Sequence, residues 1–375
     1  MKILLATGVF YPDVGGPAIH VKKIADRLIS EGFDVQVVSY GEDLSKTNFN
    51  FSVTRISRKL PRVLKGLFYL STLIWHSFSS SLIYAFDPTA AGLPAFIVSF
   101  IFQKPFIIRI GGDPIWEREV ENGHRFMTIK KYYQEGLYKV DRPFTYFIIK
   151  KVLQYSDTLV VYNQFFKDFY KDYYNILDRK IKIVKHPVFK REKADNVLIE
   201  EPIFLFAGRF VKYKNLDLVI RAFDSVRKKT GRGKLLLIGA GPDLEELKQL
   251  SISLDLENEV IFRDSVSQEN LFDIIKQSSV CLGPAISEFN PNFVLESLSF
   301  GKPVLLSKEN SLSVDLSEDF LFNPFDQAEL ASKMEYFIDP DNYKKLVLLI
   351  SNLDLNRSWQ DVTDFHVNLI KDMLK

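Results

Sequence analysis

Residues 287–303 read SEFNPNFVLESLSFGKP, and this stretch decides the fold. It has the pattern of a loop followed by a short helix. Asn290 is a good N-cap, and Pro291 suits the first helical position, where its missing N–H would be unpaired anyway. Gly301 can take the positive φ with which many helices end, and the strand-like run 304–306 follows. We therefore predict a capped helix that leads into a buried strand.

Two carboxylates belong to this region, one before the helix and one within it. Glu288 precedes it, and Glu296 lies one to two turns inside it. A helix N-terminus concentrates free N–H groups and suits a phosphate, while a carboxylate can accept two hydrogen bonds from the cis-diol of a sugar. Because 47 of the 375 residues are Asp or Glu, two acids at this distance are common by chance. The spacing between Glu288 and Glu296 therefore indicates a site only in combination with the capped helix.

The charge of the chain is unevenly distributed. Residues 1–195 hold 29 Lys and Arg against 19 Asp and Glu, a net charge of +10, whereas residues 196–375 have a net charge of −8. This asymmetry predicts that the first half meets an anionic partner, such as a membrane surface, a lipid phosphate or a nucleic acid. No recognised RNA- or DNA-binding motif accompanies the charge, so we expect no nucleic acid partner.

The compartment follows from composition. Cys281 is the only cysteine, which excludes an intrachain disulfide and favours a reducing, cytosolic setting. Residues 1–7 read as a buried strand rather than a signal peptide, and no clean run of about 20 apolar residues is present. We therefore expect a cytoplasmic protein.

Strand and helix patterns alternate along the chain. Residues 3–6 predict a strand, 18–31 a helix and 33–39 a second strand. The turn before the helix contains Gly15 and Gly16, which fit either an anion site or tight turn geometry alone. The alternation restarts after a polar linker, which predicts two domains. Their expected bounds are 1–190 and 200–356, with the C-terminal helix 357–375 packing back on the first domain.

Polar residues follow several predicted strands, at the edge where doubly wound sheets bind ligands. Asp113 follows the strand 106–110 and is a catalytic candidate, although an Asx turn before Pro114 is an equal alternative. Arg209 and Lys214 follow the strand 204–207, where two cations could clamp a diphosphate.

One region of the first half is basic and rich in aromatic residues. Residues 44–86 contain no acidic residue and look helical from Pro61. Arg58, Arg62 and Lys65 recur at helical spacing and predict a shared basic face. Such a face beside aromatic residues fits attachment to an anionic membrane surface. The alternative is an ordinary solvated helix face.

With these motifs in place, the sequence resembles the retaining glycosyltransferases of family 4. The resemblance implies a GT-B fold, in which two α/β, Rossmann-like domains face a central cleft. It covers nearly the whole chain. The matching motifs are Gly15-Gly16, Gly208-Arg209 with Lys214, the loop 238–242, the E-x7-E pair Glu288 and Glu296, and the run 301–304.

The resemblance also implies roles for single residues. Arg209 and Lys214 would hold the diphosphate of a nucleoside-diphosphate sugar such as UDP- or GDP-hexose. Glu296 would bind the ribose diol, and Glu288 would lie against the donor sugar as a catalytic residue. The remaining implied donor-binding residues are Gly15 and Gly16 at the phosphates, Phe289, Asn290 and Asn292 near the leaving diphosphate, and Val266 at the nucleobase.

The implied chemistry is a retaining transfer that needs no cofactor and no metal. Fixed cations and N–H dipoles stabilise the leaving diphosphate, and a carboxylate stabilises the positive charge on the sugar. The only Asp-x-Asp, at 339–341, reads as a turn or helix cap. The acceptor would be a lipid-linked or surface-polysaccharide intermediate at the inner face of a membrane.

Two departures from the family pattern keep an alternative open. Phe289-Asn290-Pro291 stands where many members carry Gly-Phe-Gly, and residues 111–113 stand where many carry a histidine at a strand end. The alternative is a non-catalytic GT-B protein that binds a sugar nucleotide or a partner glycosyltransferase.

Overall fold

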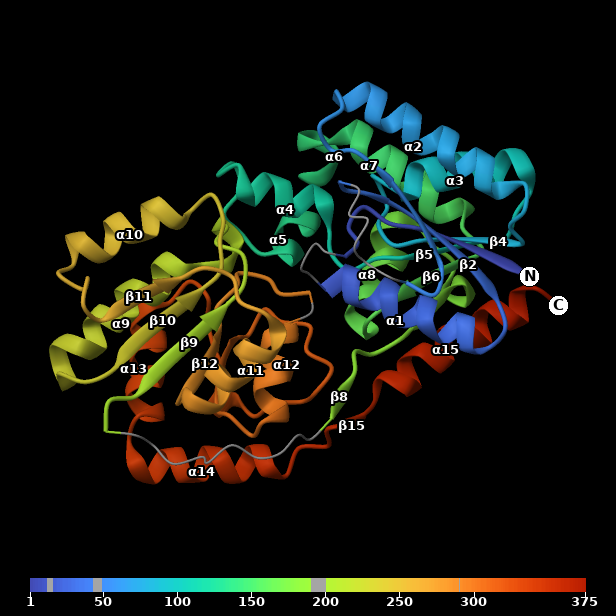
Figure 1. Ribbon diagram of the computed structural model, residues 1–375. Coiled ribbons are helices and arrows are strands. Elements are labelled where there is room, and N and C mark those ends of the chain that lie inside the picture. Colours follow the sequence, from blue (N-terminus) through green and yellow to red (C-terminus); the bar gives the residue numbers. More distant parts are fainter. Residues whose placement is uncertain (12–15, 43–48, 190–199, 290) are drawn as a thin grey trace. The chain divides into compact units, whose positions relative to one another are not determined.

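The computed structural model describes residues 1–11, 16–42, 49–189, 200–289 and 291–375 (Figure 1). Their contacts divide the chain into two compact units. The first comprises Met1–Ile115, Tyr138–Pro187 and Arg357–Lys375, and the second comprises Trp116–Leu137 and Val188–Asn356.

The first unit is built on a sheet of seven parallel strands in the order β3-β2-β1-β4-β5-β6-β7. Strands of a parallel sheet with both faces covered read as continuous apolar runs, and β4 is buried along its whole length. The strands are β1 (Lys2–Ala6), β2 (Asp34–Tyr40), β3 (Ser52–Ile56), β4 (Leu82–Ala85), β5 (Phe106–Arg109), β6 (Thr158–Val161) and β7 (Ile181–Ile183).

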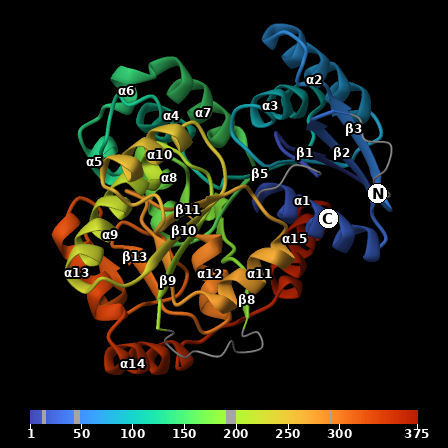
Figure 2. The same cartoon turned by 60° about the vertical axis from the view of Figure 1, so that its left-hand side comes forward.

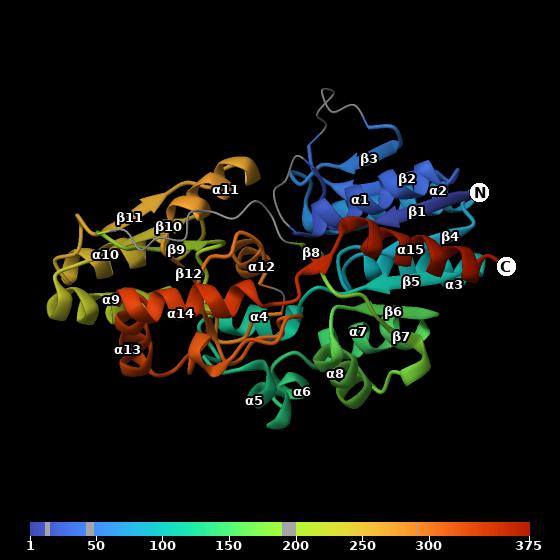
Figure 3. The same ribbon diagram turned by 90° about the horizontal axis from the view of Figure 1, so that it is seen from below.

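Helices cover both faces of this sheet, with α2, α3 and α7 on one face and α1 and α15 on the other (Figure 1). The C-terminal helix α15 runs beside α1 (Figure 3). Arg27 Nε on α1 donates to Asp364 Oδ1 on α15 at 2.6 Å. The helices are α1 (Gly16–Ser30), α2 (Arg62–Ser77), α3 (Gly92–Phe102), α6 (Tyr138–Asp141), α7 (Pro143–Tyr155), α8 (Gln164–Tyr174) and α15 (Trp359–Met373).

The second unit is built on a sheet of six parallel strands in the order β11-β10-β9-β12-β13-β14. Helices α9 and α13 lie on one face, and α11 and α12 lie on the other (Figure 2). The strands are β9 (Ile203–Ala207), β10 (Lys234–Ile238), β11 (Val260–Arg263), β12 (Val280–Gly283), β13 (Val304–Ser307) and β14 (Leu321–Phe322). The helices are α9 (Leu216–Thr230), α10 (Leu244–Ser253), α11 (Gln268–Gln277), α12 (Asn292–Ser299), α13 (Gln327–Phe337) and α14 (Pro340–Ser351). A separate two-stranded sheet pairs β8 (Val188–Phe189) with β15 (Asn356–Arg357).

The segment 116–137 groups with the second unit, although the expected domain bounds placed it in the first. It contains most of α4 (Pro114–Glu121) and all of α5 (Ile129–Gln134). The backbone N–H of Ile129 donates to Ser287 Oγ at 3.0 Å, which ties α5 to the loop before α12. The sequence gives no sign of this contact, because the residues on either side of the segment belong to the first sheet.

The helix predicted in residues 287–303 is present, with a small difference at its start. α12 begins at Asn292, and Pro291 occupies the N-cap position instead of the first helical position. Gly301 has the predicted positive φ, at 75°, and β13 follows. Asn290 and Gly15 lie outside the described residues, and so does most of the predicted linker.

Candidate active site at the carboxyl edge of the second sheet

Two glycine-containing loops meet where β9 and β10 end. A Cβ on Gly239 would lie 1.9 Å from the carbonyl oxygen of Gly208, and a Cβ on Gly241 would lie 2.1 Å from that of Phe210. The backbone N–H of Phe210 donates to the carbonyl of Ala240 at 2.9 Å. The glycines therefore let the two loops pack backbone against backbone, and this contact fixes the loop that carries Arg209.

Both predicted diphosphate-binding cations lie beside Tyr213. Arg209 Nη2 donates to the Tyr213 hydroxyl at 2.9 Å and forms an ion pair of 3.1 Å with Glu121. Lys214 Nζ lies 5.2 Å from the centroid of the Tyr213 ring and forms an ion pair with the carboxylate of Glu288. Arg209 keeps 60% of its side chain exposed, whereas Lys214 keeps 16%.

Burial and charge act in opposite directions on these groups. Burial alone lowers the pKa of Lys214, but the neighbouring Glu288 carboxylate outweighs it, so the pKa of Lys214 is raised. Burial raises the pKa of Tyr213, which keeps its phenol neutral. The site therefore presents two permanent cations, Arg209 and Lys214, beside the uncharged ring of Tyr213.

The backbone of the loop that carries Glu288 forms hydrogen bonds like those between β-strands. The backbone N–H of Glu288 donates to the carbonyl of Glu309 at 2.9 Å, and its own carbonyl accepts from Ser311 N at 3.0 Å. Phe289 is 5% exposed, and its ring packs edge-on against Trp116 with centroids 5.5 Å apart. Phe289 was predicted to bind the donor, and the structure places its side chain in the packing of the site.

The second carboxylate of the E-x7-E pair lies on the face of α12 that meets α11. Glu296 is half-buried and accepts a hydrogen bond of 2.7 Å from Gln268 Nε2. Val266, two residues before Gln268, is partly buried against the core of this unit. Asn292 is half-buried at the first position of α12.

Several residues of the site were missed by sequence reasoning. Glu121 lies 88 residues before its partner Arg209, and Trp116 reaches the site only because the segment 116–137 joins the second unit. No spacing pattern connects them. Tyr213 could have been identified as a site residue from the sequence, because it is an aromatic residue that lies between the two predicted phosphate-binding cations in the same loop.

The candidates in the first unit have different surroundings. Asp113 is buried; its Oδ1 accepts from the backbone N–H of Ile115 at 3.1 Å and its Oδ2 from the Tyr174 hydroxyl at 3.3 Å. This is the geometry of the alternative Asx turn. A role for Asp113 in catalysis stays a prediction. Gly16 is the first residue of α1.

The predicted basic face needs one correction. Arg62 is exposed at the start of α2, and Lys65 lies one turn later with its ammonium 5.9 Å from the Tyr40 ring. Arg58 does not share this helix face, because α2 starts only after the cap residue Pro61. Arg58 lies in the preceding turn, where its guanidinium donates to the Tyr40 carbonyl at 3.5 Å.

The remaining features of the described residues bear on metal binding and on membranes. Within the described ranges, no group of three or more His, Cys, Asp or Glu residues could hold a metal ion. Asp339, from the only Asp-x-Asp, caps α14, as predicted. No helix in the part of the chain that the structure describes is long and apolar enough to cross a bilayer.

The site lies in a region with known relatives. Residues 189–349 match the family model described as Glycosyl transferases group 1. An uncharacterised glycosyltransferase from Methanocaldococcus jannaschii is 26% identical over 58% of this chain and 53% of its own length, so the chain spans about half of that relative. Alpha-monoglucosyldiacylglycerol synthase from Streptococcus pneumoniae is 23% identical over 81% of this chain and 70% of its own.

Solved structures extend the likeness to the whole chain. Sucrose-phosphate synthase from Thermosynechococcus elongatus matches with a TM-score of 0.76 at 17% identity, over 99% of this chain and 98% of that chain. Anabaena HepE in complex with UDP-glucose matches with a TM-score of 0.75 at 15% identity, over 99% of this chain and 100% of that one. At these identities the likeness concerns the fold, and it confirms the predicted GT-B architecture of two parallel-sheet α/β domains.

Proposed function

We propose that this protein is a retaining glycosyltransferase of family 4 that transfers a hexose from a nucleoside-diphosphate sugar. The observation that carries the proposal is the gathering of Arg209, Lys214 and Glu288 around Tyr213 in a glycosyl transferases group 1 domain. A fold alone does not define a function, but this combination of charges suits a diphosphate.

The donor would bind through its diphosphate and its ribose. Arg209 is exposed enough to form two N–H contacts with phosphate oxygens. Lys214 would share its charge between Glu288 and the diphosphate. Glu296 would accept hydrogen bonds from the ribose hydroxyls, with Gln268 holding one carboxylate oxygen in place. HepE is known in complex with UDP-glucose, which makes a uridine diphosphate sugar the first donor to test here, beside the guanosine diphosphate sugars.

The transfer step would use these groups electrostatically. Negative charge develops on the leaving diphosphate, and the two cations are already in position to stabilise it. The carboxylate of Glu288 would face the positive charge on the sugar ring, and a departing phosphate oxygen would help to accept the proton of the acceptor. We propose that neither a cofactor nor a metal ion takes part.

Features of the first unit support a proposal for the acceptor and for the location of the protein. We propose a lipid-linked or surface-polysaccharide acceptor at the cytoplasmic face of a membrane, where the protein binds peripherally. The support is a set of exposed residues on helices α2, α3, α6 and α7, which contact one another in series. Helices α2, α3 and α7 contain no acidic residue.

We call this set the basic–apolar surface. Its exposed apolar side chains would enter the interface between head groups and acyl chains, and its basic side chains would contact anionic head groups. The exposed apolar residues are Val63, Leu67, Phe68, Trp75, Phe78, Phe100, Ile101, Val140, Phe144 and Phe147, and the exposed basic residues are Arg62, Lys139 and Lys151.

A panel of nucleoside-diphosphate sugars tests the donor assignment. Binding and slow hydrolysis of each sugar are measured for the wild type, Arg209→Ala and Glu296→Ala. We expect one donor to bind, its diphosphate to be released slowly, and both variants to lose binding. Binding without release, even with membrane lipids as acceptor, would favour the non-catalytic alternative. If no donor binds, the site assignment is wrong.

A further inference from the structure

Polar residues stand at or just beyond the carboxyl ends of three neighbouring strands of the first sheet. Arg109 is the last residue of β5, Tyr162 directly follows β6, and His186 lies three residues after β7. Nearby Ile107, Val160 and Val184 belong to the core beneath α1 and α15. Arg109, Tyr162 and His186 are buried and form a polar row at the carboxyl edge of the sheet.

Two further histidines, on α1 and α15, lie near this row. His20 of α1 and His186 share a hydrogen bond of 3.2 Å between Nε2 and Nδ1. His366 of α15 bonds through Nδ1 to the Tyr84 hydroxyl at 2.9 Å. The guanidinium of Arg109 lies 4.7 Å from the Tyr162 ring, whose centroid is 4.1 Å from that of His186. We call Arg109, His20, His186 and His366 the arginine–histidine cluster.

The cluster has several buried nitrogen atoms without a partner. Arg109 is 3% exposed, and among the described residues its Nε and Nη2 have no hydrogen-bond acceptor. His20 Nδ1, His186 Nε2 and His366 Nε2 are also unpartnered within that part of the chain. No ion pair of Arg109 with a described acid is present. Buried polar groups are almost always satisfied, and an unpaired buried guanidinium is especially costly.

We infer that the arginine–histidine cluster binds a phosphate-type oxyanion. The guanidinium supplies two N–H donors in a fixed plane. A neutral imidazole carries a hydrogen on one ring nitrogen only, so the bonded pair His20 and His186 offers one further N–H donor. His366 offers another from Nε2 when its Nδ1 accepts from the Tyr84 hydroxyl. The carboxyl edge of a doubly wound sheet is where such folds bind ligands. A water molecule would satisfy single atoms but would leave the charge of Arg109 uncompensated. The inference does not depend on the donor site of the second unit.

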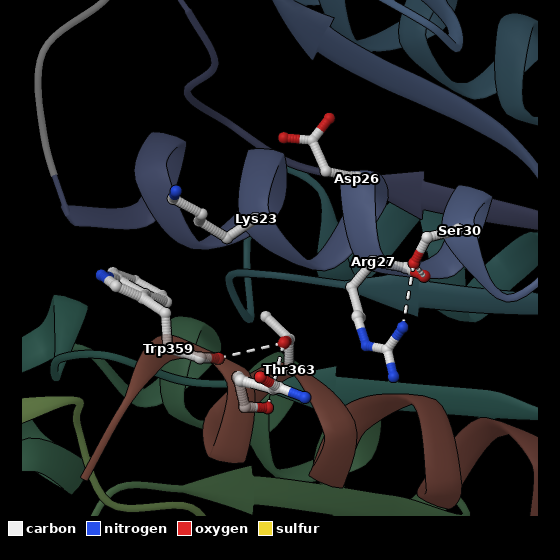
Figure 4. A pocket seen from close by; sticks show the side chains of 7 residues that line it. Lys23, Asp26, Arg27, Ser30, Trp359 and Thr363 are labelled. Atoms are coloured by element: carbon white, nitrogen blue, oxygen red, sulfur yellow. Dashed lines mark hydrogen bonds between the residues drawn. The ribbon is translucent and has the colours of Figure 1, made fainter. Parts of the chain in front are cut away.

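A pocket of about 450 Å³ between α1 and α15 lies beside the cluster. Figure 4 shows Lys23, Asp26 and Arg27 of α1 on one side of it and Trp359 and Thr363 of α15 on the other. The indole ring of Trp359 borders both the pocket and the cluster, because it lines the pocket and its centroid lies 4.8 Å from that of His20.

Calorimetric titration with inorganic phosphate tests the inference. The titrated protein carries Arg209→Ala with Lys214→Met and Glu288→Gln, so that the proposed donor site does not contribute and no buried charge is left without its partner. We expect saturable binding of one phosphate per chain, weakened at least tenfold by adding Arg109→Gln. Lys23→Gln, on the pocket wall, serves as the matched control and should change the affinity less than threefold.

A second variant and a second ligand complete the test. His186→Gln should weaken binding even if Arg109→Gln does not fold, which circular dichroism checks. Glycerol phosphate, titrated in parallel, distinguishes a free ion from the head group of a larger substrate: tighter binding than inorganic phosphate identifies the latter. Absence of binding for both ligands, or binding unchanged in Arg109→Gln and His186→Gln, would overturn the inference. Donor binding by the unaltered protein reports separately on the proposed function.

Discussion

The ammonium of Lys214 and the carboxylate of Glu288 form an ion pair whose two side chains are 16% and 11% exposed. The pair joins the loop after β9 to the loop before α12, and so it connects the residues proposed to bind the diphosphate with the residue expected to face the sugar. Each charge is removed from water only because the other compensates it. The pair is therefore both a structural link and a site that is charged before any ligand arrives.

Removing one partner should cost more than removing both charges. In Lys214→Met, the Glu288 carboxylate stays buried without its cation, and we expect the free energy of unfolding to fall by about 3 kcal/mol. Lys214→Met combined with Glu288→Gln should recover part of this loss. Urea denaturation of the wild type and the three variants measures the coupling. Additive effects of the two substitutions would contradict an energetically important pair.

Glu296 should affect ligand binding and leave stability almost unchanged. A charged hydrogen bond to a ribose hydroxyl contributes about 1.5–3 kcal/mol, so Glu296→Gln should weaken nucleoside-diphosphate binding roughly 10- to 100-fold. Glu269→Gln, an exposed acid at the start of the neighbouring α11, is the control and should bind normally. Equal affinities of the two variants for the nucleotide would disprove the ribose assignment.

The backbone contact between the two glycine loops should be intolerant of a methyl group. In Gly239→Ala the new Cβ would lie 1.9 Å from the Gly208 carbonyl oxygen, and the backbone has a φ of +148°. We expect a loss of at least about 2 kcal/mol in the free energy of unfolding.

Gly231→Ala is the matched control for this loop contact. Gly231 also has a positive φ, of +67°, but nothing lies within 4 Å of its Cβ position. Only backbone strain remains, and we expect a loss of about 1 kcal/mol. Thermal unfolding of both variants compares them. A cost for Gly239→Ala no larger than that for Gly231→Ala would show that the loops separate freely.

The basic–apolar surface should bind anionic vesicles. Reversing two charges, in Arg62→Glu with Lys151→Glu, should weaken binding by about 2 kcal/mol or more, roughly 30-fold, because each basic residue near such a surface contributes about 1 kcal/mol. Lys228→Glu with Lys344→Glu makes the same charge change on α9 and α14 of the second unit. Sedimentation with vesicles at low salt measures both. Equal binding to neutral and anionic vesicles would disprove the electrostatic part of the proposal.

The sequence was sufficient for features that depend on neighbouring residues. The helix after Glu288, the positive φ of Gly301 and the alternation of strands and helices all follow from local patterns. The contact of Ile129 with Ser287 and the pairing of Arg209 with Glu121 join residues far apart in the chain, and no periodicity reports them. Arg109 is a similar case. The sequence placed it in a predicted strand, but that its Nε and Nη2 have no acceptor among the described residues depends on every neighbouring element.

The buried histidines of the first unit should make the protein sensitive to mild acid. Burial lowers the pKa of His20, His186 and His366 well below 6.5, with a further contribution from the Arg109 charge. Below about pH 6.5 the unfolded chain therefore takes up protons at these sites and the folded chain does not. The free energy of unfolding then falls with decreasing pH, by up to about 1.4 kcal/mol per pH unit for each histidine.

Urea denaturation between pH 7.5 and 5 tests this dependence. His366→Gln should reduce the slope of the unfolding free energy against pH by about one proton equivalent, or roughly 1.4 kcal/mol per pH unit. Saturating phosphate should also reduce the slope if its charge favours protonation of the cluster, because the folded protein would then take up protons as well. An identical slope for the wild type and His366→Gln would mean that the buried imidazoles titrate as they do in the unfolded chain.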